Sequence, residues 1–213
     1  MVKVPDHLTW QEAATLPCAG VTAWNCLHGP VPLEAGQTVL TLGSGGVSTF
    51  VLAFAKAAGT RVIVTPSEEA KAARLRALGA DVVIDRSTQS NWGDAVRDAT
   101  GGAGADLVVE AFGADTIEQS MRAVALHGQI IMLIARGATK PELVLPARHY
   151  GASMATIRRV FVGHRDSFEA MNRSLTLTRF RPVIDKVFTF DHVAAAYRHF
   201  MKGDSSGKVV IAM

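Results

Sequence analysis

A glycine-rich segment is the clearest candidate for chemistry in this chain. Residues 40–48 read LTLGSGGVS. Gly43 permits a tight turn, and Gly45 lets backbone N–H groups approach an anion because no Cβ stands in the way. Ser48 takes the place of a third glycine, where a small residue still lets a helix pack closely on a strand. Either a phosphate group binds here, or the segment is a glycine-rich turn that binds nothing.

The residues around this segment alternate between strand and helix. The patterns predict strands at 38–42, 61–65, 82–84, 107–110 and 129–134, and helices at 47–58, 68–78, 92–100 and 116–124. We expect Ser67 to cap the second of these helices and Gly79 to end it. Strands joined by helices pair in parallel, and their nearly continuous apolar character indicates that both sheet faces are covered. We therefore predict an α/β fold with a doubly wound, Rossmann-type sheet, in which the glycine segment carries a dinucleotide pyrophosphate on a helix N-terminus.

Further elements are predicted on either side of this alternation. A capping-box pattern at 9–12 predicts a helix that begins near Trp10 and ends at Pro17. After Pro146 we predict a strand at 155–162 and a helix at 166–177. The last residues predict a strand at 183–190, a helix at 191–201 capped by Asp191, and a strand at 208–211. We thus divide the chain into a helical lead-in (1–35), a dinucleotide-binding domain (36–180) and a tail (181–213).

The end of the second strand bears on which dinucleotide would bind. An NAD site usually places Asp or Glu there, about 20 residues after the glycines, to hold the ribose hydroxyls. This chain has Thr65 instead, and Thr65, Ser67 and Lys71 are able to donate to a 2′-phosphate. These residues favour NADP(H) over NAD(H). Two acids, Glu68 and Glu69, would repel phosphate, unless they only stabilise a helix N-terminus.

Spacing argues against two other uses of a Rossmann sheet. A short-chain dehydrogenase needs Tyr and Lys four residues apart, but Tyr150 and Tyr197 are each followed at that distance by a methionine. A Rossmann methyltransferase usually has an acid two residues before its first glycine, where this chain has Thr41.

Composition excludes several classes of protein. Lys and Arg number 22 against 19 Asp and Glu, a net charge of +3. The basic residues are scattered, which does not favour nucleic acid as a partner. Two cysteines cannot form a disulfide framework, so a reducing cytoplasm is expected. No apolar run reaches the roughly 18 residues that span a bilayer, so no membrane partner is expected.

Several motifs together resemble a known family. They are AATLPCAGVTAW at 13–24, GSGGVS at 43–48, ALGAD at 77–81, RPVID at 181–185 and GKVV at 207–210. In this order they are similar to the medium-chain dehydrogenase/reductase superfamily, and most to its alcohol dehydrogenase-like and quinone oxidoreductase-like members. The resemblance implies an NAD(P)-dependent oxidoreductase that transfers a hydride reversibly between a nicotinamide and an alcohol, a carbonyl or an activated C=C bond. Small alcohols, carbonyls or quinones would be its substrates.

The resemblance also implies the residues that would contact the cofactor. Together with Thr65, Ser67 and Lys71, the possible donors to a 2′-phosphate, the full set is Thr22, Gly43, Ser44, Gly45, Gly46, Val47, Thr65, Ser67, Lys71, Ala111, Phe112, Ile134 and Ala135. No catalytic acid or base is assigned, and Asp85, Asp106 and Glu110 are expected to be structural. Cys18 stands where zinc-dependent relatives have a zinc ligand. Zinc needs about three protein ligands, and the others would come from a domain that this chain lacks, so no zinc is expected.

The resemblance further implies that a barrel-like substrate domain precedes the nucleotide-binding fold in complete relatives. Here the match starts almost at Met1, and the tail would pack on that domain, leaving its strands partly unpaired and apolar in its absence. We expect a homodimer joined through the strand at 155–162. Two other hypotheses stay open: a dinucleotide-binding module without catalysis, and an inactive remnant that binds nothing.

Overall fold

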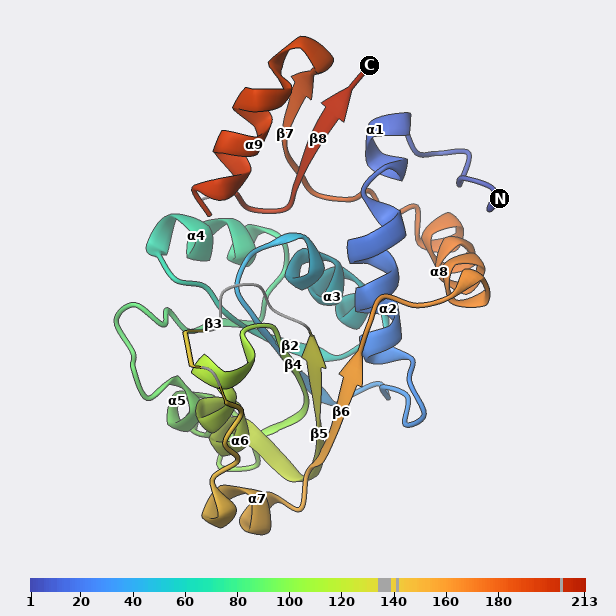
Figure 1. Cartoon of the computed structure of the whole chain (residues 1–213). Coiled ribbons are helices and arrows are strands. Elements are labelled where there is room, and N and C mark those ends of the chain that lie inside the picture. Colours follow the sequence, from blue (N-terminus) through green and yellow to red (C-terminus); the bar gives the residue numbers. More distant parts are fainter. Residues whose placement is uncertain (134–138, 141, 204) are drawn as a thin grey trace.

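A six-stranded parallel sheet forms the centre of the molecule (Figure 1). The computed structural model describes residues 1–133, 139–140, 142–203 and 205–213. The strands lie in the order β3-β2-β1-β4-β5-β6. Their bounds are β1 Thr38–Leu42, β2 Arg61–Thr65, β3 Val82–Val83, β4 Ala105–Glu110, β5 Val124–Leu133 and β6 Thr156–Val160. This is the strand order of the doubly wound dinucleotide-binding fold, so the predicted fold class is confirmed.

Helices cover both faces of the sheet, as the apolar strands require. The helices that follow the strands are α3 Gly46–Ala57, α4 Glu69–Ala77, α5 Trp92–Ala99, α6 Ile117–Ala123, α7 Ala147–Ser153 and α8 Arg165–Thr178. In β1, Val39 belongs to one buried cluster with the phenylalanines of α3, whereas Leu40 belongs to a second cluster with Trp92 and Met121. Successive strand residues point to opposite faces, so each strand contributes to both cores.

The N-terminal segment differs from its prediction. The capping box of Thr9 and Glu12 is present and starts α1 (Trp10–Ala13), but that helix ends well before Pro17. Pro17 instead lies near the start of a short π-helix, η1 (Leu16–Gly20), which leads into α2 (Val21–Leu27). Proline is accepted there because the first N–H groups of a helix have no partner within it. No helix was predicted over residues 21–27, because their small side chains carry a weak periodic signal.

Two predicted caps are wrong. The N-cap of α4 is Glu68, not Ser67, and its side chain makes no capping hydrogen bond. Asp191 lies inside a 3-10 turn, η3 (Phe190–His192), and His192 precedes α9 (Val193–Met201). The helix α7 was also not predicted.

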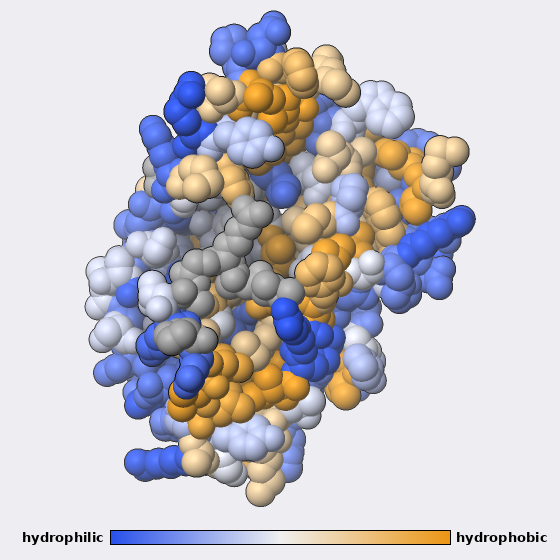
Figure 2. All heavy atoms as spheres, in the orientation of Figure 1, coloured by the Kyte–Doolittle hydropathy of each residue, from blue (hydrophilic) through white to orange (hydrophobic). Residues whose placement is uncertain are grey.

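The tail forms a unit with its own small sheet. Strand β7 (Ile184–Thr189) pairs in parallel with β8 (Lys208–Ala212), and α9 connects them. The predicted strand–helix–strand order is thus confirmed. Exposed apolar side chains gather on this unit, among them Tyr197, Phe200 and Met201, and Figure 2 shows apolar surface at the top of the view, over the tail. Among the described residues, no helix is long and apolar enough to cross a membrane.

Candidate functional site

The glycine turn (Gly43–Gly46) lies between β1 and α3, at the carboxyl edge of the sheet. Gly43 has φ +83°, a left-handed conformation that favours glycine, and its N–H donates to the Thr65 carbonyl at 3.0 Å. Gly45 has extended backbone and is exposed at the N-terminus of α3. Among the described residues, nothing would lie within 4 Å of a Cβ at Gly45. The turn is therefore open beside Gly45, next to the end of a helix whose first N–H groups have no partner within the helix.

Ser48 fixes the helix to the strand behind this turn. Its hydroxyl is buried and donates to the Leu42 carbonyl at 2.7 Å. The small side chain thus lets α3 approach β1, and it also satisfies a carbonyl at the strand end.

A segment of the tail, Ser206–Lys208, crosses the glycine turn; we call it the strap. The N–H of Gly207 donates to the Ser44 carbonyl at 3.1 Å, and Gly45 and Gly207 form an isolated parallel bridge. The stem of Lys208 covers Gly46, where an added Cβ would clash with the lysine Cδ. A larger residue than glycine at this position would have to displace the Lys208 side chain, a contact that the sequence did not reveal.

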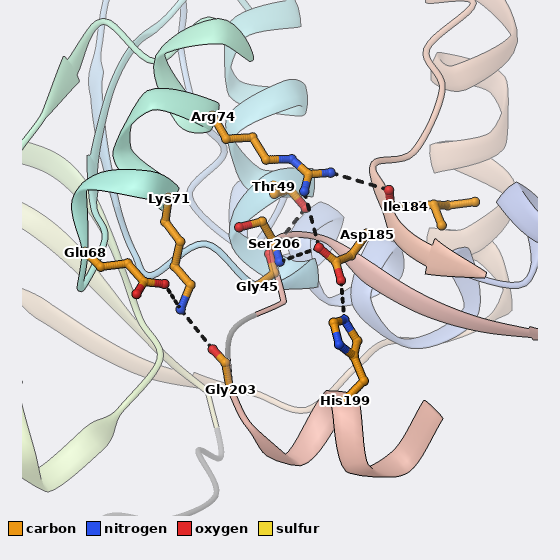
Figure 3. Close-up of polar contacts among 10 residues, drawn as sticks. All are labelled: Gly45, Thr49, Glu68, Lys71, Arg74, Ile184, Asp185, His199, Gly203 and Ser206. Atoms are coloured by element: carbon orange, nitrogen blue, oxygen red, sulfur yellow. Dashed lines mark hydrogen bonds and ion pairs between the residues drawn. The ribbon is translucent and has the colours of Figure 1, made fainter. Parts of the chain in front are cut away.

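The three residues predicted to bind a 2′-phosphate, at and after the end of β2, differ in their exposure to solvent. Thr65 is fully buried, and its hydroxyl has no hydrogen-bond partner among the described residues. Ser67 is exposed at the same edge. Lys71 is buried, and its ammonium group pairs with Glu68 at 2.7 Å and donates to the Gly203 carbonyl of the tail at 2.9 Å (Figure 3). Of the three, only Ser67 is freely presented to solvent.

Sequence reasoning missed Arg86, which follows β3 at the same edge. Its Nε donates to the Thr65 carbonyl at 3.0 Å, and its guanidinium lies 4.4 Å from the centre of the Phe112 ring. Burial lowers the pKa of Arg86, while the nearby carboxylates of Glu110 and Asp85 oppose that shift. Within the described residues, no hydrogen bond engages its two terminal nitrogens. A basic residue directly after a strand of a parallel sheet was the available signal.

The loop after β4 is held by a buried carboxylate. Glu110 is fully buried and accepts hydrogen bonds from the N–H groups of Phe112 (2.7 Å) and Gly113 (2.9 Å) and from the hydroxyl of Thr116 (2.6 Å). This fixes Phe112 beside Gly43 and Arg86, with the half-buried Ala111 next to it. Glu110 thus serves the structure of the loop.

The remaining residues predicted to contact the cofactor lie on helices or fall outside the described residues. Thr22 lies on α2, is buried, and donates to the Cys18 carbonyl at 2.7 Å. Val47 is half-buried in the first turn of α3. Ile134 and Ala135 fall outside the described residues.

With this geometry in view, the family model described as zinc-binding dehydrogenase matches residues 46–176. The chain belongs to this family. A zinc-type alcohol dehydrogenase-like protein of Schizosaccharomyces pombe is 39% identical over 215 residues, which cover 99% of this chain and 62% of that protein. The resemblance found in the sequence is confirmed.

Solved structures of relatives share the fold closely. An NAD-dependent alcohol dehydrogenase matches with a TM-score of 0.89 at 31% identity, covering 100% of this chain and 61% of that one. A 2-octenoyl-CoA carboxylase reductase in complex with NADP and 2-octenoyl-CoA matches with a TM-score of 0.89 at 25% identity, covering 98% of this chain and 51% of that one. The chain thus spans between 51% and 62% of the length of these three relatives.

The family name raises the question of zinc. Within the described ranges, no three His, Cys, Asp or Glu side chains gather as a metal site requires. Cys18 is an exposed free thiol, whereas Cys26 is buried, and burial raises the pKa of its thiol to about 12. The side chains that would hold a zinc ion are therefore not brought together within the described residues.

Proposed function

We propose that this chain is the dinucleotide-binding part of an NAD(P)-dependent oxidoreductase. The observation that carries the proposal is the open glycine turn at the N-terminus of α3, at the carboxyl edge of a Rossmann-ordered sheet. A bound nicotinamide supplies hydride transfer to or from an alcohol, a carbonyl or an activated C=C bond. Such small molecules are the proposed substrates.

The residues around the turn have distinct parts in holding the pyrophosphate. The space beside Gly45 is open, and the helix dipole favours negative charge at the N-terminus of α3. The stem of Lys208 lies on Gly46, and we propose that its ammonium group adds a positive charge for the pyrophosphate. Phe112 closes the other side of Gly43, where a Cβ would meet its ring at 3.4 Å. Thr22, Val47 and Ala111, with the undescribed Ile134 and Ala135, are proposed to line the nicotinamide side.

We propose NADP(H) as the preferred cofactor, chiefly because of Arg86. The guanidinium is half-buried, and its terminal nitrogens have no hydrogen-bond partner in the part of the chain that the structure describes. Such a group suits a phosphate, which it can bind through two parallel hydrogen bonds. Ser67 stands at the same edge, and Lys71 becomes available if the phosphate displaces Glu68 from it. Relatives of both kinds exist: one is NAD-dependent, and another was solved with NADP.

A fluorescence titration of the folded chain with NADPH and with NADH tests this proposal. We expect saturable binding of both, tighter for NADPH. Tighter binding of NADH would retain the dinucleotide site and overturn the NADP preference. Binding of neither, in a chain shown to be folded by circular dichroism, would favour the inactive remnant. Binding without reduction of any aldehyde or quinone would favour the non-catalytic module.

We also propose that the chain forms a homodimer through β6. This strand pairs only with β5 among the described residues, so its outer edge offers unpaired backbone groups, and Phe161 beside it is exposed. A second copy can pair with this edge about a two-fold axis. Light scattering should give twice the chain's mass of 22.7 kDa, and a monomer would contradict the proposal. The cytoplasmic location remains a prediction.

A further inference from the structure

The carboxylate of Asp185 is the centre of the contacts that join the tail to the Rossmann sheet (Figure 3). Its Oδ1 accepts from the N–H of Ser206 at 3.1 Å and from Arg74 at 3.3 Å. Its Oδ2 contacts Nε2 of His199 at 2.7 Å. Arg74 belongs to α4, Asp185 to β7 and His199 to α9, while Ser206 begins the strap. One mostly buried side chain, 13% exposed, thus holds four parts of the fold together.

The strap that Asp185 holds reaches the glycine turn directly. Ser206 is bound to Asp185, and the next residue, Gly207, donates to the Ser44 carbonyl. Gly207 has φ +102°, and an added Cβ would come within 2.6 Å of the Val183 carbonyl. The N–H of Lys208 donates to the same Val183 carbonyl at 3.0 Å, so hydrogen bonds hold the backbone on both sides of Gly207. Because one residue separates Ser206 from Lys208, we expect a change at Ser206 to reach Lys208.

The position of Lys208 matters because of its charge. Its stem lies on Gly46, in the first turn of α3. A helix N-terminus carries positive partial charge and repels a cation. An anion bound there interacts favourably with both the helix end and the cation. The side chain of Lys208 thus extends from the strap over the same helix end as the N–H groups of the turn.

We propose that Asp185 is a positioning residue for the dinucleotide: it anchors the strap so that Lys208 and the glycine turn together hold the pyrophosphate. This inference rests on the proposed function and extends it to a residue that does not touch the ligand. The pyrophosphate is common to both nicotinamide dinucleotides. The anchor should therefore affect NADPH and NADH equally, unlike a residue that reads the 2′-phosphate.

The experiment compares Asp185→Asn with a matched control, Asp81→Asn. Asp81 also accepts a backbone N–H (Val62, 2.7 Å) and pairs with a cation (Lys56, 2.8 Å), but it lies at the start of β3, at the opposite edge of the sheet. We expect Asp185→Asn to weaken NADPH and NADH binding by the same factor, about tenfold. The control should bind both nucleotides as the wild type does.

A double variant shows whether Asp185 acts through Lys208. If it does, Lys208→Met alone weakens binding of both nucleotides, and adding Asp185→Asn to it changes little further. Independent effects that add in full would overturn the positioning role.

Hydrogen exchange gives a readout that needs no ligand. The Gly207 amide should exchange faster in Asp185→Asn than in Asp81→Asn, because its anchor is lost. A wild-type chain that binds neither nucleotide overturns the proposed function. A wild-type chain that binds, with Asp185→Asn binding equally well and its Gly207 amide still protected, overturns the anchor alone.

Discussion

At the scale of single residues, the site depends on a few charged side chains held at one edge of the sheet. Arg86 is fixed by the Thr65 carbonyl and the Phe112 ring, whereas Lys71 is occupied by Glu68 and Gly203. A fixed, unengaged guanidinium loses little side-chain freedom on binding a phosphate, but an occupied ammonium must first exchange partners. We therefore expect Arg86 to contribute more than Lys71 to the proposed preference for NADP(H).

Replacement of this arginine tests that assignment. Arg86→Gln should weaken NADPH binding about ten- to a hundredfold, the range of one charge-assisted contact, and leave NADH binding unchanged. Arg165→Gln, which removes a surface pair with Glu169 on α8, is the matched control. Equal losses for the two nucleotides would place Arg86 away from the 2′-phosphate. Both titrations use the fluorescence assay described above.

At the scale of elements, the strand–turn–helix unit of β1 and α3 combines two glycines with different functions. Gly43 is needed for the backbone, because its φ is positive and the Phe112 ring lies close. Gly45 has ordinary extended backbone and open space around it. One glycine thus serves folding, and the other serves access to the helix N-terminus.

Alanine at each position separates the two roles. Gly43→Ala should lower the free energy of unfolding by about 1–2 kcal/mol, the cost of a left-handed non-glycine residue. Gly45→Ala should leave stability unchanged and weaken both nucleotides about tenfold, because a methyl group then stands where the phosphate approaches. Denaturant unfolding and nucleotide titration of the two variants check this. Unchanged binding by Gly45→Ala would contradict the pyrophosphate site.

At the scale of the whole molecule, the tail and the Rossmann sheet are coupled through ionised groups. Burial works to raise the pKa of Asp185, but hydrogen bonds from His199 and Ser206 and the charge of Arg74 outweigh it and lower the pKa below 3.8. A carboxyl group whose pKa is lower in the folded state than in the unfolded state stabilises the fold at every pH above its unfolded-state pKa. This stabilisation is lost as the pH falls through the folded-state pKa.

The stability of Asp185→Asn should therefore depend on pH in a defined way. At neutral pH we expect it to be about 1–3 kcal/mol less stable than the wild type, the range for a hydrogen bond to a charged group. The difference should shrink as pH falls below 3.8 and the wild-type carboxylate is protonated. Chemical denaturation across this range measures it. A difference that stays constant would show that charge has no part in the anchor.

The sequence alone determined the α/β alternation, the position of the glycine turn and the strand–helix–strand tail. These features depend on local periodicity, on glycine conformation and on motifs within short stretches, which the chain displays directly. The capping box at Thr9 and the bounds of β1 and β2 were predicted for the same reason. The caps of α4 and α9 were not, because several polar residues near each helix start were equally suitable.

The tertiary structure decided what the turn and its charges contact. Lys71 meets Gly203, 132 positions away, and Arg74 meets Asp185 across 111 positions. No local pattern encodes such pairs, because they depend on how the tail lies on the sheet. The same holds for Arg86, which the parallel sheet brings next to Thr65 and Phe112. Sequence thus located the glycine turn that we propose binds the dinucleotide, and only tertiary packing placed the strap over it.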